Sequence, residues 1–295
     1  MPRPIRAVID LAALRHNYLL AKRCAGSARA FAVVKANAYG HGLGLALRAL
    51  GDVADGFALL DLAEARALRA AGIAQPIVLL EGFFEPADLA EVAALGLTPA
   101  IHGEAQLAML ERAAPVAPLD VLLKINSGMN RLGFTADNFA GARARLRAIP
   151  GVRGITLMTH FARADDEVGI GAQLAVFKAL TAGLDLPVSL ANSAALLRFP
   201  EAAGHIVRPG IMLYGGSPMP DLQSAEAIGL RPVMTLGSEI IGVQEIVAGQ
   251  QVGYGGSFEA GGPMRIGVVA CGYADGYPRH APTGTPILVG GRRTR

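Results

Sequence analysis

Residues 32–42 read AVVKANAYGHG, and this stretch gives the first indication of the fold. An apolar run ends there in one lysine, Lys35, and small residues, Tyr39 and two glycines follow it. An uninterrupted apolar run is typical of a strand that is buried on both faces, as in a parallel sheet. Burying an ammonium group costs free energy, so a lysine at the end of such a strand needs a carboxylate partner, access to solvent or a chemical role.

Similar apolar runs recur along the chain, and segments with helical spacing separate them. The runs cover residues 30–35, 57–60, 76–80, 98–101, 119–125, 154–159, 187–191 and 205–208. Helix-like segments between them include 61–71 and 86–94. Eight strand–helix repeats predict an α/β fold, a (β/α)8 TIM-like barrel. An open doubly wound sheet would produce the same alternation.

The sequence changes character after Asp221. Residues 233–255 and 264–277 are β-branched, interrupted by glycines and partly alternating, as in a β-rich domain. We therefore expect a barrel domain at 1–220 and a smaller β domain at 221–295. The second segment is short and stops on what resembles a turn after a strand, so we expect a partial, apparently truncated β domain.

The composition argues against several classes of protein. Hydrophobic residues make up 52% of the chain and charged residues 17%, which predicts a folded core rather than long disorder. The formal net charge is +3, and the one basic cluster lies at the very end, without interleaved aromatic residues. We therefore expect no nucleic-acid binding.

The arrangement of apolar residues, cysteines and histidines indicates neither a membrane protein nor a metal site. The chain has no run of about 18 apolar residues and no signal peptide at its start, so we expect no membrane association. Two distant cysteines, Cys24 and Cys271, are typical of reduced thiols in a cytoplasmic protein. The histidines are scattered and follow no zinc-binding spacing, so no metal site is predicted.

Lys35 is the first candidate for chemistry. The glycines after it do not complete a G-x-G-x-x-G pattern, because the last position would be Leu45 or Leu47. The lysine could reach the rim of the fold or pair with a carboxylate. It could also form a Schiff base, and the carboxyl end of a barrel strand is where catalytic groups lie.

Two segments after the last runs could bind a phosphate group. Asn192 and Ser193 follow the seventh run, where they could cap a helix or bind an anion. Arg208 ends the eighth run, and Gly210 after it would let the backbone approach a ligand closely. Loops after strands 7 and 8 often bind phosphate in barrels. By itself, Arg208 would more simply be half of a surface or interface ion pair.

Together with LLKINSGMNRLGF (122–134), LMTHFARAD (157–165) and CGYADGYPR (271–279), these segments closely resemble the alanine racemase family. That family consists of pyridoxal 5'-phosphate (PLP) enzymes with a barrel and a C-terminal β domain. The resemblance covers the chain from its N-terminus to Arg295, and within the family it is greatest to bacterial enzymes of the catabolic type. It implies that the barrel at 1–220 binds PLP.

The resemblance also implies roles for the barrel residues. Lys35 would hold PLP covalently and act as a base on one face of the substrate, while Arg208 would face the ring nitrogen. Arg208 would keep that nitrogen unprotonated and so suppress side reactions. The remaining cofactor contacts would come from Tyr39, Arg131, His160, Asn192, Ser193 and the backbone at Gly210 and Ile211.

Tyr273 would be the second base and would come from the partner subunit. A free tyrosine is a weak base at neutral pH, so its surroundings must increase its basicity. His160 would hydrogen-bond Tyr273 and approach Arg208. Residue type alone would favour structural roles instead, with Tyr273 as a turn residue that packs on the β domain and His160 as a hydrogen-bonded core histidine.

The loop after the fifth run would orient the substrate. Lys124 would be carbamylated, and the resulting anion would orient Arg131, whose guanidinium suits the substrate carboxylate. Asn126 stands where family members often have aspartate, which changes the charge of this loop. Family members also continue beyond Arg295 with an S-M-D segment and a tyrosine near the site.

The resemblance implies that the protein interconverts L-alanine and D-alanine by a two-base mechanism. It also implies a cytoplasmic homodimer with shared active sites. Its role would be D-alanine biosynthesis or catabolism. Alternatives of the same fold are a broad-specificity amino-acid racemase and an amino-acid decarboxylase. A non-catalytic PLP-binding protein is the alternative from another class, if the C-terminus is truly absent. The sequence leaves open the preference between alanine and serine.

Overall fold

A computed structural model describes residues 3–113 and 117–294. The chain divides into two compact units. One unit runs from Ile9 to Met234, and the other contains the chain from Thr235 onward together with the N-terminal segment that ends at Val8. The two strands that cross these limits, β1 (Arg6–Ile9) and β10 (Met234–Gly237), pair with each other.

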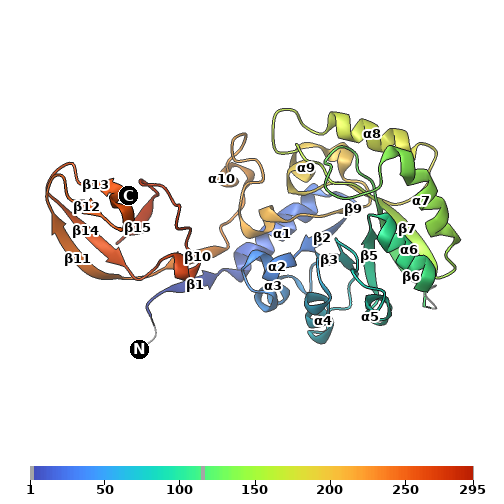
Figure 1. Cartoon of the computed structure of the whole chain (residues 1–295), viewed down its shortest axis with the longest axis horizontal. Coiled ribbons are helices and arrows are strands. Elements are labelled where there is room, and N and C mark those ends of the chain that lie inside the picture. Colours follow the sequence, from blue (N-terminus) through green and yellow to red (C-terminus); the bar gives the residue numbers. More distant parts are fainter. Residues whose placement is uncertain (1–2, 114–116, 295) are drawn as a thin grey trace. The chain divides into compact units, whose positions relative to one another are not determined.

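The first unit is a closed barrel of eight parallel strands (Figure 1), so the predicted TIM-like fold is confirmed. Each strand pairs in parallel with the next, and the last pairs with the first through Arg29 and Ala30. All eight apolar runs of the sequence become its strands. They are β2 (Arg29–Val33), β3 (Gly56–Leu59), β4 (Ile77–Leu79), β5 (Leu97–Ile101), β6 (Leu119–Lys124), β7 (Val152–Met158), β8 (Val188–Ser189) and β9 (Ile206–Val207).

Helices follow the strands and lie around the outside of the barrel (Figure 1). Several begin where an aspartate or asparagine caps free backbone amides. The Asp61 carboxylate accepts from the Glu64 amide at 2.8 Å, which starts one predicted helix at its expected residue. The helices are α1 (Leu11–Cys24), α2 (Lys35–Tyr39), α3 (Leu43–Leu50), α4 (Leu62–Ala70), α5 (Asp88–Ala94), α6 (Glu104–Ala113), α7 (Ala136–Ala148), α8 (Gly171–Thr181), α9 (Ser193–Arg198) and α10 (Ala225–Ile228), with 3₁₀ turns η1 (Pro200–Ala202) and η2 (Ile211–Tyr214).

Alternation along β2 shows how the barrel is filled. Ala30, Ala32 and Val34 belong to the large cluster between strands and helices. Phe31 and Val33 belong to a separate small cluster inside the barrel. Side chains of a strand point alternately to its two faces, so a strand that is buried on both must be apolar throughout. The interior cluster consists of Phe31, Val33, Ala58, Val78, Ala100, Leu122, Met158 and Ile206.

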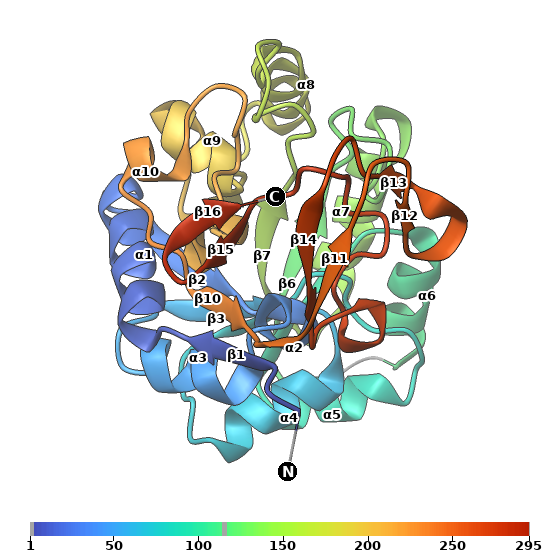
Figure 2. The same ribbon diagram turned by 90° about the vertical axis from the view of Figure 1, so that its left-hand side faces the viewer.

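The second unit is β-rich, as predicted. Its longest pair is antiparallel and joins β11 (Ile240–Ile246) to β14 (Met264–Val269), which lie side by side in Figure 2. Two shorter antiparallel pairs accompany it, β12 (Gln251–Val252) with β13 (Phe258–Glu259), and β15 (Ile287–Val289) with β16 (Arg292–Thr294). The 3₁₀ turns η3 (Tyr254–Gly256) and η4 (Tyr273–Asp275) lie between these strands in the sequence.

Candidate active site

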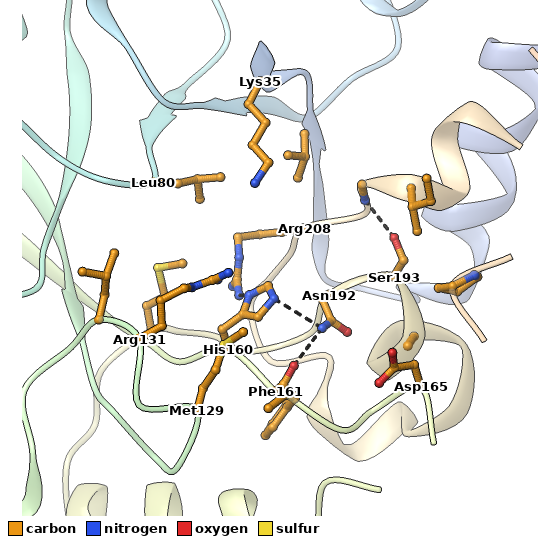
Figure 3. Close-up of a pocket in the computed structure, with 18 of the residues that line it drawn as sticks. Lys35, Leu80, Met129, Arg131, His160, Phe161, Asp165, Asn192, Ser193 and Arg208 are labelled. Carbon is orange, nitrogen blue, oxygen red and sulfur yellow. Dashed lines mark hydrogen bonds between the residues drawn. The ribbon is translucent and has the colours of Figure 1, made fainter. Parts of the chain in front are cut away.

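The candidate residues of the barrel unit meet around one cavity of ≈ 410 Å³. It lies at the carboxyl ends of the strands, because Lys35 follows β2, Lys124 ends β6 and Arg208 follows β9. Figure 3 shows Lys35, Arg131 and Arg208 extending into the same space. The predicted residues among its lining are Lys35, Tyr39, Lys124, Arg131, His160, Asn192, Ser193, Arg208, Gly210 and Ile211.

Lys35 begins a left-handed turn instead of ending a strand. The apolar run predicted Lys35 as the last residue of the strand, but β2 ends at Val33 and Lys35 is the first residue of α2. The next four residues, Ala36 to Tyr39, have φ values of 53° to 54°. Each non-glycine residue in this conformation costs about 1–2 kcal/mol, because Cβ comes close to a carbonyl oxygen. The turn is therefore strained, and its surroundings must hold it in place.

Glu64 of α4 and Asn37 hold this turn. The Glu64 Oε1 atom accepts from the Asn37 amide at 2.7 Å, and the Asn37 Oδ1 atom accepts from the Leu43 amide at 2.7 Å. The second carboxylate oxygen of Glu64 is buried and has no hydrogen-bond partner within residues 3–113 and 117–294. Sequence patterns did not identify Glu64, because it is one of several polar residues in the helix predicted at 61–71.

Tyr39, Ser193 and Gly210 form a cradle at one end of the cavity. The Gly210 amide donates to the Ser193 hydroxyl at 2.8 Å. A Cβ atom at Gly210 would lie 2.7 Å from the Tyr39 hydroxyl, so only glycine leaves this space free. Burial raises the pKa of Tyr39, which keeps its hydroxyl protonated and able to donate to an anion.

The Tyr39 ring is itself held by Tyr214, a residue that the sequence patterns did not identify. The two rings stack with centroids 4.7 Å apart, and the Tyr214 hydroxyl donates to the Val33 carbonyl at 2.9 Å. Tyr214 ends the segment HIVRPGIMLY, so its position after the Arg208 motif was the available signal. This contact ties the end of β2 to the loop after β9.

Arg208 is buried and carries its charge without a carboxylate partner in the part of the chain that the structure describes. Its guanidinium donates to the Ser189 hydroxyl at 2.5 Å and to the carbonyls of Thr159 and Leu190 at 2.8 and 3.2 Å. Burial lowers the pKa of Arg208 to about 10, so the group remains a cation at neutral pH. Ser189 and Thr159 were not identified from the sequence as its partners.

His160 is a neutral group next to this cation. Its Nδ1 atom lies 3.5 Å from Arg208 Nη2, and its Nε2 atom lies 3.5 Å from Asn192 Nδ2. Burial, followed by the charges of Arg208 and Arg131, lowers the pKa of His160 to about 3. Asn192 is fixed by its own bonds, because it caps α9 at Ala195 and donates to the Phe161 carbonyl at 3.1 Å.

Lys124 is the second buried cation of the cavity. Burial is the main reason that its pKa is lowered to about 8, and the charges of Arg208 and Arg131 act in the same direction. Glu81 opposes this shift. Four cationic side chains thus line the cavity with two carboxylates, Glu81 and Asp165, and this balance favours an anionic ligand.

Tyr273 lies in the other unit, on the 3₁₀ turn η4. Its side chain is 63% exposed, and the Arg279 guanidinium lies 5.9 Å from the centre of its ring. Tyr273 is not among the described residues that line the barrel cavity.

Residues 3–113 and 117–294 contain no cluster of three or more histidine, cysteine or carboxylate side chains arranged to hold a metal ion. No helix in these segments combines the length and the apolar character that crossing a bilayer requires.

Comparison with known proteins identifies relatives over both units. The model of the alanine racemase N-terminal domain matches residues 9–218, and that of the alanine racemase C-terminal domain matches residues 233–295. An alanine racemase from Nitrosospira multiformis is 56% identical and is aligned over 100% of this chain and 83% of its own. One from Laribacter hongkongensis is 54% identical, over 100% and 82%.

Solved structures agree with these sequence matches. The crystal structure of the biosynthetic alanine racemase from Pseudomonas aeruginosa has a TM-score of 0.96 and 50% identity, covering 99% of this chain and 82% of that one. The structure of alanine racemase from Acinetobacter baumannii has a TM-score of 0.91 and 35% identity, with the same coverage of 99% and 82%.

Proposed function

The chain belongs to the alanine racemase family, and we propose that the cavity of the barrel is where it binds PLP and interconverts L-alanine and D-alanine. The chain is a PLP-dependent amino-acid racemase. The observation that carries the assignment of the site is the placement of Lys35, Arg208 and the Tyr39–Ser193–Gly210 cradle around one cavity. All the other candidate residues of the barrel line the same cavity.

The residues present fit PLP. The cradle supplies the Tyr39 hydroxyl, the Ser193 hydroxyl and a glycine whose missing side chain leaves room for a phosphate oxygen. The excess of cations over carboxylates would compensate the charge of a phosphate dianion. Lys35 would hold the cofactor through its amine, and Arg208 would place a positive charge near the cofactor ring.

When bound, PLP withdraws electrons from the substrate Cα, so that its proton becomes easier to remove. Lys35 removes or returns this proton on one face of the substrate. Arg208 remains a cation at neutral pH, so it would disfavour protonation of the ring nitrogen and thereby the side reactions that stronger electron withdrawal allows. Arg131, exposed at the cavity, orients the substrate carboxylate through its guanidinium.

Racemisation also needs a proton donor and acceptor on the opposite face. Among the described residues that line the cavity, the one tyrosine is Tyr39. Its hydroxyl lies against Gly210 in the cradle and is therefore not the second base in this proposal. Tyr273, delivered from the partner subunit of a homodimer, takes this second role. His160 supports it as a neutral hydrogen-bonding group, because its lowered pKa keeps the ring uncharged at pH 7.

Lys124 becomes carbamylated in this proposal. An amine must be neutral to attack carbon dioxide, and a pKa of about 8 leaves roughly one lysine in ten neutral at pH 7. The nitrogen forms a bond to the carbon of carbon dioxide and loses a proton. The resulting anion would orient Arg131 and would balance the charge of Arg208.

The protein works in the cytoplasm and supplies D-alanine. The biosynthetic direction is supported by the solved relative at 50% identity, which is described as a biosynthetic alanine racemase. The resemblance to catabolic enzymes noted from the sequence points the other way. Growth of a strain that lacks its own racemase, with and without added D-alanine, tests the biosynthetic role when this chain is expressed in it.

The test of the site is substitution of Lys35. We expect Lys35→Ala to lose the covalent cofactor absorbance and at least roughly a thousandfold in racemisation rate, measured as loss of optical rotation of L-alanine. Lys178→Ala, at an exposed lysine of α8, is the matched control and should change neither. A Lys35→Ala protein that keeps both properties would remove Lys35 from the site.

A further inference from the structure

A second, larger cavity lies at the opposite end of the barrel. Its volume is ≈ 770 Å³, against ≈ 410 Å³ for the cavity at Lys35. Residues at the beginnings of the barrel strands line it, whereas residues at the ends of the strands line the first cavity. Asp120, near the start of β6, lines this cavity, whereas Lys124, at the end of β6, lines the first. Four residues of strand separate the two ends by about 13 Å.

The inner wall of this second cavity is apolar. Phe31, Val78, Leu122 and Ile206 line it, and each is buried. These side chains also belong to the interior cluster of the barrel, where Val33, Ala58 and Met158 are among the remaining members. The interior cluster therefore closes the cavity on the side of Lys35, and the two cavities are separate sites.

The rim is cationic. Four arginines line the cavity, namely Arg29, Arg143, Arg147 and Arg153, together with two carboxylates, Asp120 and Asp185. Arg153 forms an ion pair with Asp120 across the starts of β6 and β7. Arg29, Arg143 and Arg147 have no ion-pair partner within residues 3–113 and 117–294. The lining thus carries more positive than negative charge.

The position of α7 explains two of these arginines. Arg143 and Arg147 are four residues apart near its C-terminal end, so they lie on one face of the helix. Arg145 lies between them in sequence and faces elsewhere, because it pairs with Glu104 and Glu111. The same helix therefore has one arginine neutralised by carboxylates and two directed to the cavity.

From this arrangement we propose a second binding site, at the amino-terminal end of the barrel, for a small organic anion with an apolar or aromatic body. The volume lies within the usual range of about 300–1,000 Å³ for small-molecule sites, which combine an apolar wall with a few placed polar groups. Guanidinium groups bind carboxylate, sulfonate or phosphate oxygens, frequently in pairs. The apolar wall at Phe31 and Leu122 accepts the body of the ligand.

The probe for this site is 8-anilinonaphthalene-1-sulfonate, an aromatic anion whose fluorescence rises on binding. We expect one molecule to bind per chain of the PLP-loaded enzyme, undisplaced by saturating alanine. The double variant Arg143→Ala/Arg147→Ala should weaken binding at least tenfold, about 1.4 kcal/mol. Arg145→Ala removes the same kind of charge from the same helix and should leave the affinity within twofold.

Inorganic pyrophosphate tests the apolar half of the proposal. It should compete only weakly, because it has no apolar body to contact Phe31 and Leu122. Arg29→Ala, on β2, provides a second variant that does not depend on the folding of α7 and should also weaken binding of the probe. The proposal would be overturned if Arg145→Ala and Arg143→Ala/Arg147→Ala bound the probe with equal affinity. Displacement of the probe by alanine, or pyrophosphate binding as strong as that of the probe, would also overturn it.

Discussion

At the scale of single residues, the barrel cavity concentrates positive charge that the described chain only partly neutralises. Arg208 donates to one hydroxyl and two backbone carbonyls, and Lys124 lies nearby with its pKa lowered mainly by burial. Burying unpaired charge is costly, so such a site is stabilised when an anion enters it. A cofactor phosphate and a carbamate on Lys124 would both supply the missing negative charge.

Lys124 allows a direct test of the carbamate. We expect enzyme depleted of carbon dioxide to regain racemase activity several-fold when bicarbonate is added at pH 8, where a lysine with a pKa of about 8 is half neutral. Isotope-labelled bicarbonate should give a carbamate signal by NMR. In Lys124→Ala, activity should be insensitive to bicarbonate and the signal should be missing. A parent enzyme without the signal would contradict the prediction.

His160 should make the cofactor-free protein sensitive to acid. Burial and nearby cations lower its pKa to about 3 from an ordinary value of 6.5, so only the unfolded state binds this proton between those pH values. The free energy of unfolding therefore falls as pH decreases through this range. At pH 5 the loss from this group is about 2 kcal/mol.

The measurement is urea unfolding of the parent and of His160→Gln at pH 7.5 and pH 5. Glutamine does not titrate, so the variant should lose less stability over this range, although every carboxylate titrates equally in both proteins. An identical loss in the two proteins would show that His160 is protonated in the folded state at pH 5.

At the scale of elements, the sequence predicted the strands well and the turn after the first of them poorly. Strands buried on both faces are apolar throughout, so all eight runs could be located within a few residues. The left-handed turn has no such signature. Alanine does not favour positive φ, and asparagine adopts it mainly as an isolated residue, so four consecutive positive φ values have no sequence signal. A contact that holds the turn comes from Glu64, in another helix.

The partners of Arg208 illustrate the same limit. Thr159, Ser189 and Leu190 come from the ends of neighbouring strands and become partners only when the barrel closes. Residue type and spacing located the cation, and the family resemblance assigned its role. Its hydrogen bonds depend on strand register, which single-sequence patterns do not determine.

The turn leads to a prediction for Glu64. Glu64→Ala removes the acceptor of the Asn37 amide, so the strained turn should relax and displace both Lys35 and Tyr39. We expect weaker PLP binding and a kcat lowered roughly tenfold or more, with little change in KM for alanine.

Glu64→Gln is the matched variant, because its amide oxygen can still accept from the Asn37 amide. It should recover most of the activity, which would distinguish turn positioning from a need for the negative charge. Both the fraction of PLP retained after dialysis and kcat should decrease in the order parent, Glu64→Gln, Glu64→Ala. If Glu64→Ala binds PLP and turns over like the parent, Glu64 does not hold the turn.

At the scale of the whole molecule, the two proposed bases belong to different units. Lys35 lies at the barrel cavity, and Tyr273 lies on an exposed turn of the β-rich unit. Each active site of a homodimer would take Lys35 from one subunit and Tyr273 from the other.

This arrangement predicts complementation between two inactive variants. Lys35→Ala and Tyr273→Phe should each be inactive alone, but a heterodimer of the two would contain one site with both bases intact and one site with neither. If subunits exchange at random, half of the dimers are mixed, so activity should recover to about a quarter of the parent level. Racemisation would be measured against the fraction of mixed dimers found by native mass spectrometry. Mixed dimers without activity would contradict shared sites, because bases supplied by a single chain cannot complement each other.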